Sequence, residues 1–415
     1  MNILFVTYNT CARAAKEAKA LQGAGGHQVI VLQYAAASED ILYTTTELSS
    51  FYRNRQGLID RIAHFSDWVE VIHVHNEPNW IVSAAAEARN AVCPWVPLVF
   101  DVHDLDSQRE NGEIDMDEEP AIHSADAFIF PSKSYEKGIR HVWNTRGAPG
   151  RVIYSMCNRS DIVESPLPRI EGLVYEGATV SPLPHFNATT PGYKHYRDYT
   201  ELAAHLLVRQ IPFHLYGVRK EFWRQYLDRG AIVHESLAFV DMMQQLTRYD
   251  WGLCGHSGDH PQWQKAMPNK LFEYLAAGIP VVSINAGEVS EFINEHGLGY
   301  AADGLDYLSR IARDSVLRNA YADNVIGLRH KFTMESQVPE IEALYGEAAA
   351  YRQSRLGAGV HLRPGQAGVE ACGSWLCFEK PEASAKAYVG GDKLQPELRR
   401  AHSDNQEKAQ GKLSA

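Results

Sequence analysis

The sequence predicts an α/β protein with two doubly wound, Rossmann-like domains that face a cleft, followed by a disordered tail. Three observations carry this prediction. Short apolar segments alternate with helical segments along most of the chain, the order of elements found in parallel sheets covered by helices. A proline-containing stretch at 161–169 separates two such series and is typical of a linker. After residue 356, Gly, Pro, Ala and Ser dominate without periodic apolar positions.

Length and composition agree with two globular domains. The chain has 415 residues, of which 45% are hydrophobic and 22% charged, as in ordinary globular proteins. The net charge of −11 argues against a nucleic-acid partner, which would require a basic surface. We predict a first domain at 1–165, a second at 170–335, a helix at 336–356 that crosses back to the first domain, and a disordered tail at 357–415.

The same survey bears on location. Residues 1–8 are typical of a first strand and lack the basic leader and long apolar core of a signal peptide. No run of eighteen apolar residues predicts a membrane-spanning helix. The six cysteines are sparse and scattered, which favours a reduced, cytoplasmic protein. Peripheral association with the inner face of the membrane stays open.

The first domain begins with a strand, a loop and a helix. Residues 2–7 are apolar, residues 12–23 are rich in helix-forming Ala, Lys and Glu, and residues 29–33 are again apolar. Ligands of such sheets bind at the carboxyl ends of the strands, so the first loop is a place where a nucleotide-sugar or an acceptor could approach. Thr10 and Arg13 are our candidates there, although Arg13 equally fits an ordinary surface position on the helix.

The next strand, 71–75, carries two histidines. His73 and His75 alternate along it and should therefore face the same side. Two imidazoles can form half of a metal site, but no third ligand stands at a useful spacing, so we predict no metal. His75 lies at the strand end and is a candidate for the acceptor side.

A further strand at 97–101 ends in a polar group. Asp101, His103 and Asp104 follow its apolar run, at the sheet edge where chemistry is expected. An imidazole there can donate to a sugar hydroxyl or a phosphate, or take a proton near neutral pH. His103 and Asp104 are therefore our catalytic candidates, whereas Asp101 is expected to anchor the loop. The alternative is that His103 is only a satisfied polar residue.

The most informative stretch of the second domain is 265–283. Pro268 precedes a helix, apolar side chains repeat at helical spacing, and Gly278 suits the left-handed conformation that ends a helix. A helix start attracts phosphate through its free N–H groups, and Lys270 adds a cation. Glu273, one turn on, can accept hydrogen bonds from sugar hydroxyls. The alternative is a pair of solvated charges on an ordinary helix.

Residues 269–282, Asn-Lys-Leu-Phe-Glu-Tyr-Leu-Ala-Ala-Gly-Ile-Pro-Val-Val, resemble the donor-binding helix of GT-B glycosyltransferases, in particular family-4-like enzymes of the group 1 type. The resemblance implies that Glu273 holds the ribose of a nucleotide-sugar, with Lys270 and Asn269 beside it. One departure stands out. Many retaining members have a second Glu seven residues earlier, which touches the donor sugar, and this chain has Ala266 there.

The resemblance extends to other positions. It implies that His75 and His103 line the cleft, and that basic residues near the first loop and helix of the second domain bind the donor diphosphate. Lys194 and Arg197 are the nearest candidates for that role. His256, in a Gly- and Ser-containing loop whose N–H groups are accessible to an anion, is a further candidate for donor contact.

The resulting expectation is a hexosyltransferase-type glycosyltransferase (EC 2.4) of polysaccharide or glycoconjugate biosynthesis. It would move sugar from a UDP-, GDP- or TDP-linked donor to a hydroxyl of a glycan, a lipid-linked acceptor or a small molecule. We expect no metal and no cofactor. Inversion would require a base, for which His103 or Asp104 is the candidate, whereas retention would let the donor phosphate take the proton. A nucleotide-sugar epimerase and a non-catalytic glycosyltransferase-like subunit remain as alternatives.

Overall fold

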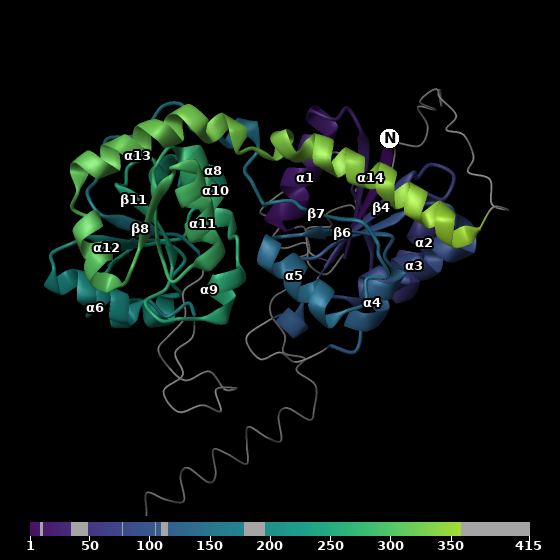
Figure 1. The fold of residues 1–415 in the computed structure, drawn as a ribbon, viewed down its shortest axis with the longest axis horizontal. Coiled ribbons are helices and arrows are strands. Elements are labelled where there is room, and N and C mark those ends of the chain that lie inside the picture. Colours follow the sequence, from purple (N-terminus) through teal and green to yellow (C-terminus); the bar gives the residue numbers. More distant parts are fainter. Residues whose placement is uncertain are drawn as a thin grey trace, which may run out of the picture. The chain divides into compact units, whose positions relative to one another are not determined.

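The computed structural model describes residues 1–8, 11–34, 49–76, 78–103, 105–108, 115–177 and 196–357. Within this part of the chain, two separate parallel sheets are each surrounded by helices, which confirms the predicted α/β class (Figure 1). The predicted tail lies outside the described residues, and the exact domain limits stay a prediction.

The first sheet has seven strands in the order β3-β2-β1-β4-β5-β6-β7, with every neighbouring pair parallel. The chain builds outward from β1 to β3 and then returns to the other side of β1 with β4, so the order reverses between β1 and β4. Ligand sites of doubly wound sheets lie at the strand ends beside such a reversal. The strands are β1 Asn2–Thr7, β2 Gln28–Tyr34, β3 Ser49–Tyr52, β4 Val71–His75, β5 Leu98–Asp101, β6 Ala127–Phe130 and β7 Gly150–Val152.

Helices cover both faces of this sheet and bury its alternating apolar side chains in two cores. One core includes Leu4, Ile72 and Phe100, which pack with the helices α2 to α5. The other includes Ile3 and Phe5, which pack with α1 and α14. The helices are α1 Ala12–Gly23, α2 Arg55–His64, α3 Trp80–Val92, α4 Glu118–Ser124, α5 Lys133–Val142 and α14 Met334–Leu356, with short 3-10 turns η2 Asp106–Gln108 and η3 Arg159–Asp161.

The second sheet has six parallel strands in the order β10-β9-β8-β11-β12-β13 and repeats the same reversal, between β8 and β11. The strands are β8 Leu173–Tyr175, β9 Phe213–Leu215, β10 Ile232–Val233, β11 Trp251–Gly255, β12 Val281–Ile284 and β13 Gly299–Ala302. The helices are α6 Thr200–Val208, α7 Trp223–Leu227, α8 Phe239–Leu246, α9 Pro261–Lys265, α10 Asn269–Ala277, α11 Gly287–His296, α12 Leu305–Ile311 and α13 Ser315–Leu328, with 3-10 turns η4 Lys220–Phe222 and η5 Arg329–Lys331.

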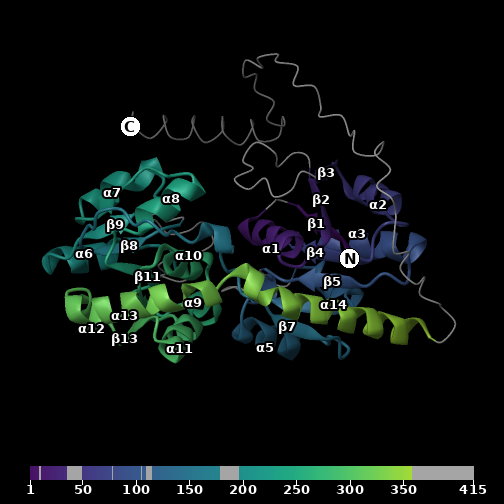
Figure 2. The same ribbon diagram turned by 90° about the horizontal axis from the view of Figure 1, so that it is seen from above.

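The last described helix, α14, packs on the first sheet although it follows the second in sequence. Met334, Ile341 and Tyr345 are buried in the same core as Ile3 and Phe5. The two views of the ribbon show α14 running beside α1 (Figure 2). The helix begins at Met334, two residues before the predicted start at 336, because the Met334 N–H donates to the Cys157 carbonyl and fixes an earlier first turn.

One predicted helix is divided in two. The sequence predicts a continuous helix over 305–326, whereas α12 ends at Ile311 and α13 begins at Ser315. The Asp314 side chain accepts the Leu317 N–H at 2.9 Å and caps the new start, as short acidic side chains commonly do.

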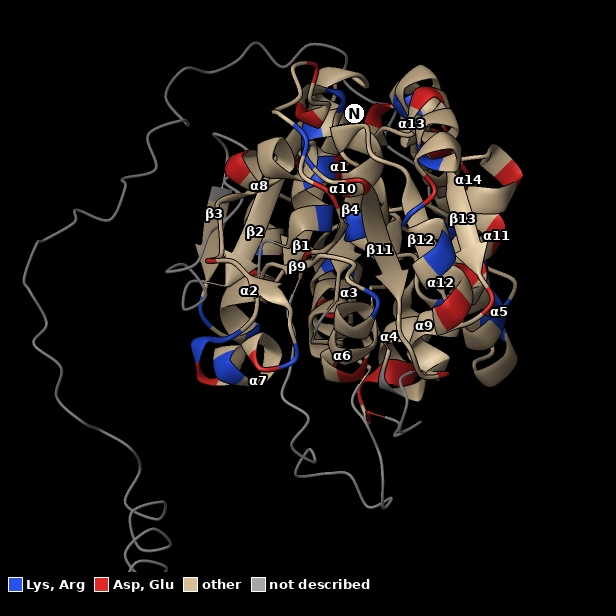
Figure 3. Ribbon diagram, turned by 90° about the vertical axis from the view of Figure 1, so that its left-hand side faces the viewer, with Lys and Arg blue, Asp and Glu red and all other residues tan. Residues whose placement is uncertain are grey.

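Within the described part of the chain, no helix combines the length and the apolar character that a membrane span requires. On the face seen in Figure 3, Lys/Arg and Asp/Glu segments are interspersed along α12, α13 and α14.

Candidate donor and acceptor site

Helix α10 is held by the stripe of apolar residues that the sequence predicts. Leu271, Phe272 and Leu275 are buried in the core of the second sheet. Gly278 ends the helix in the left-handed conformation with φ of 80°. These contacts fix the face of the helix that carries Lys270 and Glu273.

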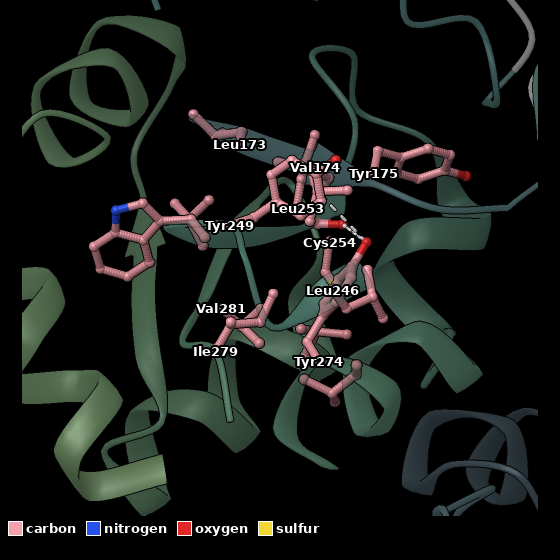
Figure 4. Close-up of a cluster of buried hydrophobic side chains, with 14 of the residues drawn as sticks. Leu173, Val174, Tyr175, Leu246, Tyr249, Leu253, Cys254, Tyr274, Ile279 and Val281 are labelled. Atoms are coloured by element: carbon pink, nitrogen blue, oxygen red, sulfur yellow. Dashed lines mark hydrogen bonds between the residues drawn. The ribbon is translucent and has the colours of Figure 1, made fainter. Parts of the chain in front are cut away.

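A buried tyrosine connects this helix to the sheet. The Tyr274 hydroxyl lies 3.3 Å from the carbonyl oxygen of Val174 and 3.4 Å from that of Leu253 (Figure 4). It also accepts the N–H of Glu176 at 3.2 Å. The middle of α10 is therefore tied to β8 and to the residue that follows it, at the strand beside the reversal of the sheet.

Glu273 is ionised although it is only 7% exposed. The Lys16 ammonium of α1 donates to Glu273 Oε1 at 3.0 Å. Burial alone raises the pKa of Glu273, but Lys16, a hydrogen bond with Glu176 and the nearby Lys270 lower it below its ordinary value. The carboxylate is thus charged at neutral pH and able to accept hydrogen bonds.

Glu176 takes the opposite protonation state. Burial, and next the charge of Glu273, raise the pKa of Glu176 well above its ordinary value, so it holds a proton. Lys270 Nζ lies 4.7 Å from the centre of the Tyr175 ring and 5.6 Å from that of Trp263. With Glu176 neutral, one carboxylate faces two ammonium groups, and the resulting positive charge suits a diphosphate.

His256 organises the loop that follows β11. Its Nε2 lies 2.5 Å from the Asp198 carbonyl oxygen, and its Nδ1 accepts the Gly258 N–H at 2.9 Å. The side chain is 1% exposed, and burial lowers its pKa. Because both ring nitrogens are used by the backbone, the donor contact predicted for His256 stays a prediction.

The remaining predicted donor residues are placed as follows. Asn269 is exposed at the first position of α10. The Arg197 guanidinium lies 5.1 Å from the centre of the Tyr196 ring, just before α6. Lys194 lies outside the described residues. The donor roles of these three residues stay predictions.

Five ionisable side chains gather under the carboxyl ends of β4 and β5 in the first domain. Arg13 Nε donates to both oxygens of Asp101, at 3.0 and 2.9 Å, and Nη1 donates to the Ile153 carbonyl at 2.8 Å. The rings of His73 and His75 are stacked with centroids 4.4 Å apart, which confirms that they face the same side. The fifth member is Glu17 of α1, whose Oε1 lies 3.1 Å from Arg13 Nε.

Both Arg13 and Asp101 differ in setting from the sequence-based expectation. Arg13 is 5% exposed and Asp101 fully buried. Burial raises the pKa of Asp101, but Arg13 and the histidines outweigh it and hold the carboxyl well below its ordinary value. The acceptor role predicted for Arg13 stays a prediction, and the side chain lies in the interior rather than on the helix surface.

His103 stands at the outer end of this network. Its ring Nε2 lies 3.0 Å from His75 Nδ1, and its ring Nδ1 lies 3.6 Å from Cys11 Sγ. The backbone N–H of His103 donates to Asn76 Oδ1 at 2.6 Å. Burial lowers the pKa of His103 to about 4, whereas it raises the pKa of Cys11 to about 11. The imidazole is neutral near pH 7, and His75 orients it.

Two other predicted site residues cannot be placed. Thr10, on the acceptor side, and Asp104, the second catalytic candidate, lie outside the described residues. His75 is buried behind His103, so it reaches an acceptor only through that imidazole.

Sequence reasoning missed Lys16 and Glu176 on the donor side and Glu17 in the buried network. A signal existed for two of them. Arg13, Lys16 and Glu17 recur at helical spacing among the alanines of α1, a charged stripe on a helix that must bury one face. Nothing local points to Glu176.

No family model matches the chain. A stretch of 80 residues is 35% identical to Glucosyltransferase 3 of Streptococcus gordonii, and it spans 19% of this chain and 24% of that relative. The chain thus spans about a quarter of the length of the curated relative it matches.

Solved structures resemble the whole described fold. Anabaena Alr3699/HepE in complex with UDP aligns with a TM-score of 0.59 and 16% identity, over 83% of this chain and 100% of that chain. An alpha-glucosyltransferase in complex with UDP-glucose and DNA aligns with a TM-score of 0.59 and 11% identity, over 83% of this chain and 98% of that chain. AviGT4, a glycosyltransferase of avilamycin A biosynthesis, aligns with a TM-score of 0.52 and 12% identity, over 84% of this chain and 98% of that chain.

This is the GT-B fold. The prediction of two doubly wound GT-B domains is therefore confirmed at the level of architecture. In the GT-B frame, Lys270 and Glu273 lie on α10 of the second domain, and His103 follows β5 of the first.

Proposed function

We propose that this protein is a glycosyltransferase that transfers a sugar from a nucleotide-diphosphate donor, with UDP as the first candidate nucleotide, to an acceptor hydroxyl. One observation carries the proposal. In a GT-B fold, the ionised Glu273 and the charged Lys270 stand together at the start of α10. A carboxylate suits ribose hydroxyls, while an ammonium and free helix N–H groups suit a diphosphate.

The chemistry of this arrangement is leaving-group stabilisation. As the bond between sugar and diphosphate breaks, negative charge grows on the diphosphate. Fixed cations such as Lys270, together with the N–H groups at the start of α10, stabilise that charge without the help of a metal. In the described structure the Lys16 ammonium donates a hydrogen bond to Glu273 Oε1, so a ribose that binds Glu273 must share the carboxylate with Lys16 or replace it.

On the acceptor side, we propose His103 as the group nearest to the reacting hydroxyl. A neutral imidazole held by His75 can accept a hydrogen bond or a proton. With a pKa of about 4 it is a weak base, which fits a role in orienting the hydroxyl at least as well as full proton abstraction. Ala266 stands where many retaining enzymes have an acid. An assay of the product's anomeric configuration distinguishes retention from inversion.

The first prediction tests the donor site. Glu273→Gln keeps the volume of the side chain and removes its charge, so the affinity for UDP should fall by about 10- to 100-fold, as for other charge-assisted hydrogen bonds. Calorimetric titration with UDP, GDP and TDP measures the affinity. The exposed Glu291→Gln on α11 is the matched control and should bind as the wild type does.

The outcomes separate the possibilities. Binding of no nucleotide by the wild type would refute the enzyme proposal. Unchanged affinity in Glu273→Gln would remove the ribose role from this residue but leave the rest. Binding with neither transfer nor epimerisation of a bound UDP-sugar would favour a non-catalytic subunit, and an epimerised sugar would favour an epimerase.

We also propose a cytoplasmic location and an acceptor that is a glycan, a lipid-linked molecule or a small molecule. The four cysteines in the described part of the chain are free thiols, as expected in a reducing compartment. The net charge of −11 supports an acceptor other than a nucleic acid. Peripheral association with the inner membrane face depends on the acceptor and is part of the same proposal.

A further inference from the structure

Four fully buried side chains in the first domain are arranged like the ligands of a metal ion. They are Glu17 of α1, His73 and His75 of β4, and Asp101 of β5. Each offers one ligand atom, and these atoms all lie within 4.8 Å of one another. Imidazole and carboxylate groups together are a frequent ligand set of first-row divalent metals.

The distances between these atoms are informative. His73 Nε2 lies 3.7 Å from Glu17 Oε2 and 3.6 Å from Asp101 Oδ2, and His75 Nδ1 lies 3.4 Å from Asp101 Oδ2. These separations exceed the usual 2.7–3.2 Å of a hydrogen bond. They come close to the ~3.3–3.5 Å that separates neighbouring ligands of a tetrahedral metal with bonds of about 2.0–2.2 Å.

Several of these polar atoms also lack hydrogen bonds. Both carboxylate oxygens of Glu17 and the Nε2 of His73 are buried without a hydrogen-bond partner. Buried polar atoms are nearly always satisfied by protein, water or an ion. Three such atoms in one place indicate that something besides these side chains belongs among them.

The charge of the cluster points the same way. Two carboxylates face one guanidinium, because Arg13 Nε contacts both Asp101 oxygens and lies 3.1 Å from Glu17 Oε1. With neutral imidazoles this leaves one uncompensated negative charge in the interior, which is costly. Either a proton on Glu17 or a cation can compensate it. In the metal-free cluster a proton that Glu17 shares with Asp101 would compensate the charge, and a bound cation would displace that proton.

Surrounding groups are placed as around a metal. The Tyr345 hydroxyl of α14 lies 2.7 Å from His73 Nδ1, so the opposite nitrogen, Nε2, points into the cluster. Such outer partners orient metal-binding histidines. His75 Nδ1 is also 3.0 Å from His103 Nε2, so an ion bound to this nitrogen would replace its contact with His103.

We propose that Glu17, His73, His75 and Asp101 bind one first-row divalent metal ion, with zinc as the probe for the class. Four protein ligands in an enclosed interior fit a structural site rather than a catalytic one. The ion links α1, β4 and β5 beneath the acceptor side. This inference is independent of the proposed glycosyl transfer, since the donor diphosphate is bound by other residues.

The test uses the full chain, purified without a metal-affinity tag after expression with added zinc. Elemental analysis should give about one metal per chain, as for a closed four-ligand site. Cobalt substitution should give the visible absorption of a tetrahedral ion, and a strong chelator should lower the melting temperature until zinc is restored.

Matched variants assign the ligands. Glu17→Gln and His73→Gln should lose the metal and melt at a lower temperature than the wild type. His123→Gln, on α4 beside Glu119, should keep the metal and the melting temperature of the wild type. Should the buried variants fail to fold, Tyr345→Phe provides the test, because loss of an outer partner should weaken zinc by about 10- to 100-fold.

Metal-free wild type that binds no cobalt and melts alike with and without chelator would overturn the proposal. So would a Glu17→Gln protein that is as stable as the wild type, because Gln imitates the protonated acid of the metal-free cluster.

Discussion

At the scale of single residues, Tyr274 shows how one hydroxyl connects core packing to the donor site. Its ring is buried in the core of the second sheet. Its oxygen lies within hydrogen-bond distance of the Val174 and Leu253 carbonyls and of the Glu176 N–H. The contact with Glu176 places the neutral carboxyl beside Glu273. Removal of the hydroxyl would therefore affect both stability and the geometry at the start of α10.

Tyr274→Phe should lower the free energy of unfolding by about 1–3 kcal/mol, because the Glu176 N–H and two carbonyls lose a buried partner. Urea denaturation measures this value. The control is Tyr307→Phe on α12, where the side chain is 45% exposed and the change should stay within about 0.5 kcal/mol. Equal effects of the two substitutions would contradict a hydrogen-bonding role for Tyr274.

Single residues also show the limit of reading a site from sequence. Glu273 was identifiable because it stands in a dense local motif. Its partner Lys16 is 257 positions away, and only the packing of α1 against the second domain brings the two together. Likewise, His73 and His75 were recognised as a pair, but Glu17 and Asp101 complete their cluster from other elements. The spacing of residues within one segment does not indicate contacts with residues far away in the sequence.

At the scale of elements, the close approach of α10 to β11 depends on a glycine. A Cβ atom on Gly252 would lie 2.2 Å from Cδ2 of the Tyr274 ring, far inside van der Waals contact. The absence of a side chain in the middle of β11 therefore lets α10 lie close enough for Tyr274 to reach the backbone of β8.

Gly252→Ala should lower the free energy of unfolding by about 1–3 kcal/mol or more, since the ring is fixed by its hydrogen bonds and cannot easily move. Gly327→Ala in α13 is the matched comparison, because a Cβ there meets no atom within 4 Å. That change should stabilise the protein by about 0.5–1 kcal/mol. Denaturant titration of both variants measures the two values, and a stable Gly252→Ala protein would show that α10 is free to shift.

Elements whose signals are local were predicted well. The bounds 12–23 of α1 and the Gly278 end of α10 are as expected. The division between α12 and α13 and the early start of α14 were not predicted. The second of these depends on a contact between Met334 and Cys157, and tertiary contacts override local preference at helix ends.

At the scale of the whole molecule, the alternation of strands and helices was enough to predict two doubly wound sheets. The protonation of its interior was beyond sequence analysis, because burial decides it. Burial lowers the pKa of six histidines in the described part of the chain below the ordinary value, and these are His73, His75, His103, His214, His234 and His256. The folded protein therefore resists protonation at positions where the unfolded chain accepts it.

His214 offers the cleanest test, because it lies on β9, far in sequence from the carboxylates of both sites. Burial, and next the neighbouring His234, lower the pKa of His214 to about 4. Its contribution to stability is complete above the unfolded value of about 6.5 and is lost as the pH falls toward 4. Over that range the unfolded state binds a proton that the native state does not, at about 1.4 kcal/mol per pH unit.

His214→Gln should therefore make the unfolding free energy less sensitive to acid. Between pH 6.5 and 4.5, the loss of stability should be smaller than in the wild type by about 2 kcal/mol, whatever offset the substitution adds at neutral pH. Urea titrations at a series of pH values give both curves. His141→Gln on the exposed surface of α5 is the matched control substitution. Parallel curves for His214→Gln and the wild type would mean that His214 is protonated in the native state as readily as in the unfolded chain.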